Sequence, residues 1–308
     1  MNGHWAAVTA ALGATAFFAL STGLKHRSAG QAAPAGPGSG HRSPSQFLLA
    51  TARHPLWLGG IVADVGGFTL QVVALHLGAL AVVQPLLILA LPLSLVVNHK
   101  IAGTRVSKRE IIGGAALVAA LVGFLAVSGA SSPRITGPAQ AADRAPTIAL
   151  ASGAVVTVVL CVLLAPRARR TTAAAMLGVA VGVTYACTAA LIKSGSNVAL
   201  SGGLLALVSS WQLYLLVAAG LTGLALSQLA FRTGPLRASL PAIATIDPLL
   251  SIALGVLVYD EHLRSGPVAV LGEIACLLLL CASAFYLSRL RGVQEAPERG
   301  AARVGADA

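Results

Sequence analysis

The sequence predicts an all-α, polytopic membrane protein of about nine transmembrane helices in two repeats of opposite orientation. Of its 308 residues, 56% are hydrophobic and 10% are charged, and the mean hydropathy is +0.82. Soluble domains carry about a quarter of charged residues. The apolar residues also fall into runs of the length that a spanning helix needs, about 20 residues. Finally, two parts of the chain share a pattern of glutamines and prolines, which indicates an internal duplication.

Nine apolar runs are long enough to be spans. Trp5, Trp57, Trp211 and Tyr214 lie at their ends, where aromatic rings anchor helices at the membrane surface. The predicted spans are 4–24, 56–77, 80–98, 111–128, 147–164, 173–192, 211–231, 238–259 and 267–288.

The connections between these runs are polar, charged or rich in small residues. We expect a loop over 25–55 that is disordered over 28–46, with a short surface helix over 47–52. A second loop covers 129–146, and residues 199–209 read as a short re-entrant or interfacial segment. The charged tail over 289–308 is predicted to be disordered and cytoplasmic.

The basic residues determine the predicted orientation. The net charge of +11 does not indicate nucleic-acid binding, because the Lys and Arg residues stand between apolar runs rather than on one soluble face. With nine spans, four of the 21 Lys and Arg residues lie on the side of the N-terminus and 17 lie on the other side. The positive-inside rule then predicts a multi-pass plasma-membrane protein with the N-terminus outside and the C-terminus in the cytoplasm.

An internal repeat of about 160 residues is the feature typical of many transporter folds. Residues 13–25 resemble 182–193, and spans one and two correspond to spans six and seven. The offset of five spans is odd, so the two copies have opposite orientations. The matched residues are Gln71, Gly78, Pro85 and Pro92 with Gln228, Gly234, Pro241 and Pro248. The predicted units are a first repeat over 1–128, a loop and linking helix over 129–172, and a second repeat over 173–288.

Acidic residues inside apolar spans are the first candidates for a functional site. Asp64, Asp247 and Glu273 lie within spans, and no Lys or Arg lies deep in any predicted span. Asp247 is the strongest candidate, because it lies in the middle of a span and precedes Pro248. It would bind a proton or a cationic group, and the alternative is a protonated acid bonded to a neighbouring helix. Glu273 is either a gate residue or a buried structural acid. Asp64 is either a binding residue or an acid whose side chain extends toward the membrane surface.

Three glutamines and four prolines complete the predicted site. Gln71 and Gln228 occupy matching positions of the repeat, so a central cavity would receive one from each half, and Gln84 is the third polar group. Helix–helix hydrogen bonding is the alternative role of these amides. The prolines are expected to break helices and free carbonyl groups for a polar cavity; they are Pro85, Pro92, Pro241 and Pro248. We find no catalytic motif, no metal site that the sequence identifies and no reason to expect a cofactor.

The second half contains the segment GPLRASLPAIATIDPLLSIALGVLVYDEHL, and the first contains HPLWLGGIVADVGGFTLQ followed by AVVQPLLILALPLS. In these segments the chain resembles the drug/metabolite transporter superfamily (EamA-like), nearest the NIPA-like magnesium transporters and their bacterial relatives. The resemblance implies ten helices in two inverted halves, or nine in the NIPA-like branch, with one helix of the first half absent. Two acidic positions of that branch are here Phe68 and the sequence Asn98-His99-Lys100, while Asp260-Glu261 remains in the second half. These losses remove oxygen ligands that Mg²⁺ prefers.

Three functions are therefore open at the level of sequence. The first is a secondary transporter that exports or exchanges a small metabolite, and the second is a transporter of Mg²⁺ or another divalent cation. The third is a membrane scaffold or accessory subunit without transport activity. An enzyme is not expected. The expected partners are a small-molecule or cation substrate and membrane lipid, with no nucleic acid, and a homodimer is an open alternative.

Overall fold

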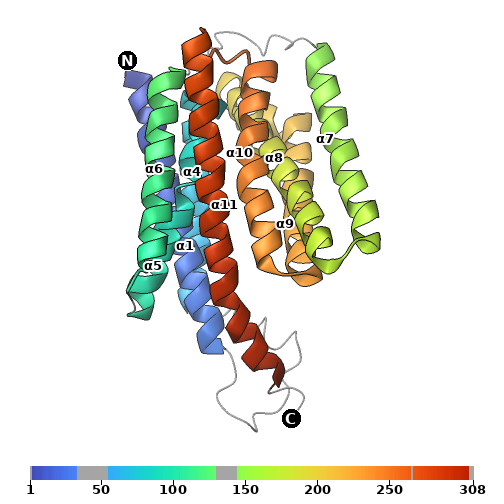
Figure 1. Ribbon diagram of the computed structural model, residues 1–308. Coiled ribbons are helices and arrows are strands. Elements are labelled where there is room, and N and C mark those ends of the chain that lie inside the picture. The colour runs from blue at the N-terminus through green and yellow to red at the C-terminus, as the bar shows by residue number, and fades with distance from the viewer. Residues whose placement is uncertain (1, 33–54, 104, 130–143, 265, 305–308) are drawn as a thin grey trace.

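A computed structural model of the protein describes residues 2–32, 55–103, 105–129, 144–264 and 266–304. The described chain folds into long helices and contains no β-sheet (Figure 1). The elements are α1 (Asn2–Ala32), α3 (Pro55–Leu77), α4 (Leu80–Leu87), α5 (Ala90–Ala102), α6 (Lys108–Ser128), α7 (Arg144–Leu164), η1 (Ala165–Arg167), α8 (Arg170–Val208), α9 (Trp211–Thr233), α10 (Leu236–Val258) and α11 (Pro267–Val304).

Nine stretches of the described residues are long and apolar enough to cross a membrane. They agree in number and order with the nine predicted spans, so the prediction of an all-helical fold of the multi-pass membrane type is confirmed. The stretches are Trp5–Lys25, Pro55–Leu77, Leu80–Lys100, Lys108–Ser128, Thr147–Arg167, Arg170–Val208, Trp211–Thr233, Ala238–Val258 and Pro267–Leu290.

Several element ends differ from the prediction. The sixth span does not stop at 192: α8 runs on to Val208 and bends at Gly203, whose φ of 77° is in the left-handed region. The apolar segment expected over 199–209 is thus mainly the end of α8. Helix α1 reaches Ala32 and α11 reaches Val304, beyond the ends at which we expected a loop and a disordered tail. The surface helix expected over 47–52 and most of the loop over 28–46 lie outside the described residues.

The proline pairs behave differently in the two halves. In the first half the chain breaks between α4 and α5, with Pro85 inside α4 and Pro92 near the start of α5. The hydroxyl of Thr15 in α1 donates to the carbonyl oxygen of Leu86 at this break, over 3.2 Å. In the second half α10 is one helix from Leu236 to Val258 that contains both Pro241 and Pro248. The expected helix break at Pro248 is therefore not observed, since each proline costs the helix only its own N–H donor and a local bend.

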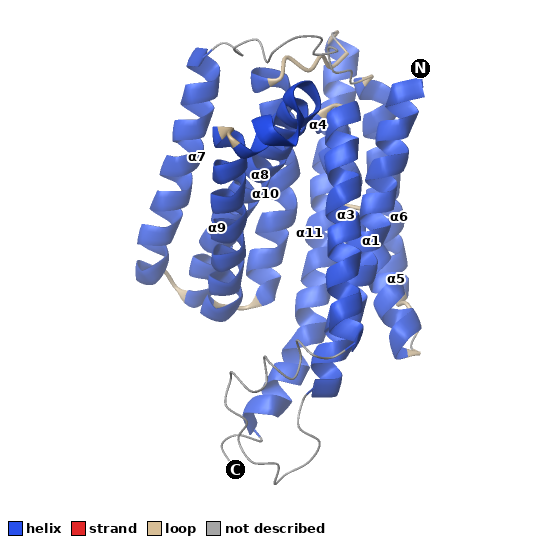
Figure 2. Ribbon diagram, turned by 180° about the vertical axis from the view of Figure 1, so that it is seen from behind, coloured by secondary structure: helices blue, strands red, loops and turns tan. Residues whose placement is uncertain are grey.

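The helices form two groups that stand side by side (Figures 1 and 2). One group contains α1, α3, α4, α5, α6 and α11, in which α1 packs along α3 and α6 packs along α11. The other contains α7, α8, α9 and α10, with α8 in contact with the three others. We call the end of the bundle at which the N-terminus lies the upper end, as in Figure 1.

Small residues let the helices approach closely within each group. A Cβ atom on Gly178 would lie 2.6 Å from the carbonyl oxygen of Ser239, and one on Gly182 would lie 2.9 Å from Cβ of Ile246. These two glycines bring α8 against α10. In the other group, a Cβ on Gly67 would lie 2.8 Å from the ring of Phe18, which brings α3 against α1.

The largest buried cluster joins the two groups. It contains Leu75 of α3, Leu80 and Val83 of α4, Ala186 of α8 and Leu254 of α10. These residues come from the upper parts of α3 and α10, the middle of α8 and the start of α4, so the shared core lies toward the upper end. A separate cluster at the lower end of the second group consists of Ala165, Ala173, Leu177 and Ala230, all from η1, α8 and α9.

Candidate functional site

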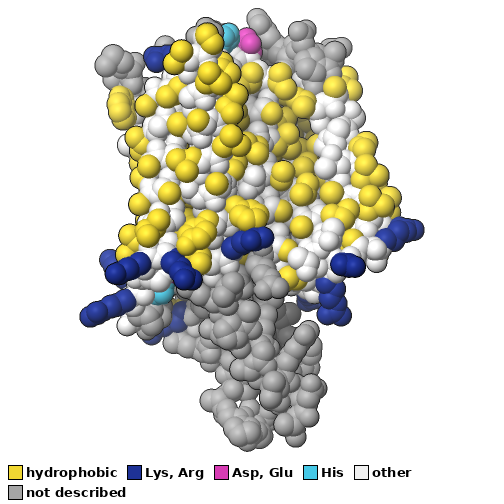
Figure 3. Space-filling view, viewed as in Figure 1, with side chains coloured by type: hydrophobic (Ala, Val, Ile, Leu, Met, Phe, Trp, Pro, Cys, Tyr) yellow, Lys and Arg dark blue, Asp and Glu magenta, His cyan; other side chains and the backbone are white. Residues whose placement is uncertain are grey.

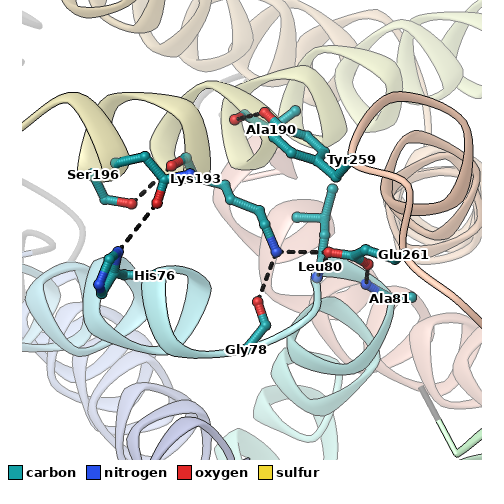
Figure 4. Close-up of polar contacts among 10 residues, drawn as sticks. His76, Gly78, Leu80, Ala81, Ala190, Lys193, Ser196, Tyr259 and Glu261 are labelled. Carbon is teal, nitrogen blue, oxygen red and sulfur yellow. Dashed lines mark hydrogen bonds and ion pairs between the residues drawn. The ribbon is translucent and has the colours of Figure 1, made fainter. Parts of the chain in front are cut away.

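A buried ion pair lies at the upper end, where the two groups of helices meet (Figure 4). Nζ of Lys193 in α8 lies 2.6 Å from Oε1 of Glu261, which follows α10. The two side chains are only 5% and 0% exposed. We call this site the upper seam and define it by Gly78, Leu80, Ala81, Lys193, Tyr259 and Glu261.

The carboxylate of Glu261 also binds the first residues of α4. The backbone N–H of Leu80 donates to Oε1 over 2.6 Å, and that of Ala81 donates to Oε2 over 2.8 Å. The first N–H groups of a helix have no partners within the helix, and the helix dipole favours a negative charge there. Glu261 therefore caps α4 from the other group of helices.

The ammonium group of Lys193 is held by both groups. Besides Glu261, it donates to the carbonyl oxygen of Gly78 over 2.7 Å, and it lies 5.4 Å from the centre of the Tyr259 ring. The hydroxyl of Tyr259 in turn donates to the carbonyl oxygen of Ala190. Burial of an ion is costly unless such partners replace its water. The close partners explain why a lysine is stable at this depth.

The end of α10 is shaped to return Glu261 over the bundle. The backbone N–H of Glu261 donates to the carbonyl oxygen of Gly255 over 3.0 Å, and Asp260 has a left-handed φ of 52°. A Cβ on Gly255 would overlap Oε2 of Glu261. Glycine at 255 is therefore what lets the carboxylate lie against α10 while it reaches α4.

A second contact closes the same end. His76, near the end of α3, lies with Nδ1 3.2 Å from Oδ1 of Asn197 in α8. Helices α3 and α8 pack together here. The upper end of the bundle is thus held by one buried ion pair, one helix cap and one more exposed polar contact.

Asp247 lies in the middle of α10 at its contact with α8. A Cβ on Gly182 would lie 3.2 Å from the backbone nitrogen of Asp247, and the hydroxyl of Ser251 lies 3.4 Å from Oδ1. Tyr185 and Cys187 of α8 are close enough for an electrostatic interaction with this carboxyl. No Lys or Arg forms an ion pair with Asp247 in the described part of the chain. Asp247 thus stays a candidate for binding a proton or a cationic group.

The other predicted site residues make no hydrogen bond with Asp247 in the described residues. Gln71 in α3 is half-buried, and Gln228 lies on the exposed side of α9. Gln84 is 4% exposed and its Nε2 has no partner among the described residues. Glu273 in α11 is 6% exposed, and its Oε1 likewise lacks a partner there. Across the described chain, no three His, Cys, Asp or Glu side chains gather as a metal site would require.

Two sequence-based expectations are wrong: that the acids within spans have no basic partner, and that Lys193 lies in the connection after the sixth span. Asp64 has a basic partner, because its carboxylate forms an ion pair with Lys25 of α1 near the lower end. Lys193 is not a loop charge, because it lies inside α8 and is buried. The apolar run ends at Ile192, so the lysine was placed outside the span. The signal that could have placed it inside is the continuation of small and apolar residues from 194 to 208.

Comparison with other proteins shows similarity over almost the whole chain. The sequence is 30% identical over 289 residues to "Uncharacterized protein Cgl0250/cg0304" of Corynebacterium glutamicum, and the match covers 94% of this chain and 96% of the other. No protein-family model matches the sequence. No solved structure matches it either.

Proposed function

The chain belongs to the same family as this Corynebacterium glutamicum protein, and we propose that it is a secondary transporter of the drug/metabolite transporter type. It moves a small solute across the plasma membrane by alternating access, in metabolite export or exchange. The observation that carries the proposal is that α3 packs against α8 and α4 against α10 toward the upper end, whereas α1 and α9 have no comparable packing at the lower end of the described residues. A transporter must be able to close one end while the other is open.

The contacts between the groups support this proposal. At the upper end α3 packs against α8, and α4 packs against α10. Helix α11 also packs against α10 between the groups. In an inverted repeat, the counterpart of the α3–α8 contact is a contact of α9 with α1 at the lower end. No comparable packing of α1 against α9 occurs in the described residues. The lower ends of α8 and α9 have instead their own core, which includes no residue of the first group.

The packing within each group is also what a duplication requires. Helices α1 and α3 pack together as α8 and α9 do, and α4 and α5 contact α1 as α10 contacts α8. Helix α7 packs on α8 and α10. An inverted repeat would place the counterpart of α7 on α1 and α5.

The distribution of charge supports an orientation. Lys and Arg side chains gather around the lower end of the visible face in Figure 3, and the visible acidic side chain lies at the upper end. The positive-inside rule places the lower end in the cytoplasm and the N-terminus outside. The conformation is then closed toward the outside.

We assign the coupling role to Asp247. It lies on α10, which also leads to the upper seam, and an acid in the middle of a span is a functional-site candidate by default. A proton or a cationic group of the solute would bind there, and Ser251 would help to orient the carboxyl.

Flux measurements test the proposal. The full chain is reconstituted in proteoliposomes, and uptake of a panel of labelled organic cations, amines, organic acids and Mg²⁺ is followed with and without a proton gradient. We expect saturable flux of at least one solute, which Asp247→Asn abolishes. Absence of flux for every solute under both conditions would contradict the proposal.

A further inference from the structure

We propose that Lys193 and Glu261 are gate residues: their ion pair closes the upper end, and its separation is the step that opens that end. This inference rests on the proposed function, which requires such an opening. Neither residue belongs to the site predicted from sequence, and neither binds the solute in this role.

The position of the pair is the first argument. Lys193 belongs to α8 and Glu261 follows α10, whereas Gly78, Leu80 and Ala81 belong to the other group of helices. Three of the hydrogen bonds that hold the pair therefore cross between the groups. Opening of the upper end must break these three bonds, while the Lys193–Glu261 bond lies within one group and must rearrange with them.

The chemistry of the pair is the second argument. A contact made of apolar side chains is stable only when dry, so exposure to water on opening would be unfavourable. Two ions behave differently. They lose their hydration when the seam closes and regain it when the seam opens, so that the two states differ little in free energy. A buried ion pair is weak evidence for stability, but it suits a contact that has to open repeatedly.

The lysine related by the repeat is the third argument. Residues 13–25 and 182–193 match in sequence and end in Lys25 and Lys193. Lys25 pairs with Asp64 within its own group, and these side chains are 33% and 37% exposed. At the joined end the lysine is thus buried between the groups, and at the other end its counterpart is partly exposed and bonded within one group. If the upper end is closed and the lower end is open, the two related lysines should differ in this way.

Helix α10 connects the gate to the proposed coupling site. Asp247 lies in α10, a continuous helix that ends at Val258, shortly before Glu261. From Asp247 to Glu261 is 14 residues, or about 21 Å if the rise of a helix applies throughout. A tilt of α10 that follows binding at Asp247 would withdraw the carboxylate of Glu261 from the start of α4.

Cysteine accessibility tests the gate without knowledge of the solute. Ala186 is fully buried and lies seven residues before Lys193 on α8, so it is about two turns below the seam. We introduce Ala186→Cys into the full chain after replacing the four native cysteines by serine. The reagent is a membrane-impermeant maleimide, applied to the upper side of vesicles, and the measured quantity is the rate of labelling. The replaced residues are Cys161, Cys187, Cys276 and Cys281.

We expect Lys193→Met and Glu261→Gln each to raise the labelling rate at least about tenfold, because the remaining buried charge gains water when the seam opens. The double variant Lys193→Met/Glu261→Gln should label more slowly than either single variant, because it leaves no unpaired charge in the seam while the Gln amide oxygen can still accept from the start of α4. Lys25→Met is the matched control and should label from this side no faster than the parent. Glu261→Asp, which keeps the charge but shortens the side chain, should give an intermediate rate.

Labelling of both single variants at the parent rate would overturn the proposal, as would equal rates for the double and single variants. If a single variant does not fold in the membrane, the rate for Glu261→Asp decides, and a parent-like rate would overturn the gate. The labelling rate is measured without any solute, so it does not depend on whether transport is detected. A failed transport assay with the expected labelling pattern would reject the proposed solute panel or function and retain the gate.

Discussion

Nζ of Lys193 lies 2.6 Å from Oε1 of Glu261, although 68 residues separate the two in the chain. The pair is buried at one end of a bundle of apolar helices and holds the start of α4 to the end of α10. No similar buried pair lies where the groups meet elsewhere in the described residues. The relationship gives the bundle two unlike ends, and the following predictions depend on it.

Substitution of Gly255 by alanine should disrupt the seam. The new methyl group would overlap Oε2 of Glu261, and overpacking of this kind costs about 1–3 kcal/mol. We expect a lower melting temperature and faster labelling of Ala186→Cys from the upper side. Gly220→Ala in α9 is the matched control, because a Cβ there meets no atom within 4 Å. Unchanged stability and labelling for Gly255→Ala would show that the carboxylate does not need this space.

The contact of α8 with α10 should be equally sensitive to size. A Cβ on Gly178 would lie 2.6 Å from a backbone oxygen of α10, which cannot move without the helix. Gly178→Ala should therefore lower the thermal stability of the purified protein. Gly153→Ala in α7 should leave it unchanged or raise it slightly, since that position faces open space and alanine favours helix. Equal melting temperatures for the two variants would contradict the close packing.

The two ion pairs should differ in their contribution to stability. Removing one partner of a buried pair costs about 3–5 kcal/mol, whereas a pair exposed to water contributes about 0–1 kcal/mol. Lys193→Met should thus lower the melting temperature far more than Lys25→Met does. Denaturation in the same detergent compares them. A larger effect of Lys25→Met would reverse the assigned roles of the two pairs.

Replacement of Asp247 by asparagine should separate function from folding. The variant keeps the shape of the side chain and removes an ionisable group that has no basic partner in the described residues. We expect a melting temperature close to that of the parent, and solute flux reduced at least about tenfold because an intramembrane acid is a functional group by default. Thr157→Val, on the exposed side of α7, is the control for losses during purification and reconstitution, and it should keep full flux.

Parent-like flux for Asp247→Asn would place the coupling group elsewhere. Glu273, which is buried and has an oxygen without a partner in the described residues, would then be the next residue to replace.

The sequence was sufficient for the number and order of the spans, because these depend on local composition. It was not sufficient for the end of α8, because Glu261 holds Lys193 inside the bundle past the end of the apolar run. The break between α4 and α5 lies between Pro85 and Pro92, but its contact with Thr15, which binds the carbonyl oxygen of Leu86, depends on a distant residue. The continuous course of α10 through two prolines was likewise not evident from residue types alone.

The candidate site was predictable in part, for the same reason. Asp247 could be identified from its own span, since its significance comes from being an acid among apolar residues. The pairing of Lys193 with Glu261 could not, since each lies at the end of an apolar run and Glu261 stood out only through the resemblance to the NIPA-like branch. Only the fold places them side by side. The same applies to Asp64, whose partner Lys25 lies 39 residues before it.

Coupling between the two ends is tested by the distance between α1 and α9 at the lower end. Spin labels at Leu20 and Leu229, both exposed in the present structure, report this distance by double electron–electron resonance in proteoliposomes. With the seam intact we expect a single long distance. In Glu261→Gln, which releases the upper end, a shorter distance should appear as the lower ends approach. An unchanged distance in a variant whose Ala186→Cys site has become accessible from the upper side would contradict alternating access.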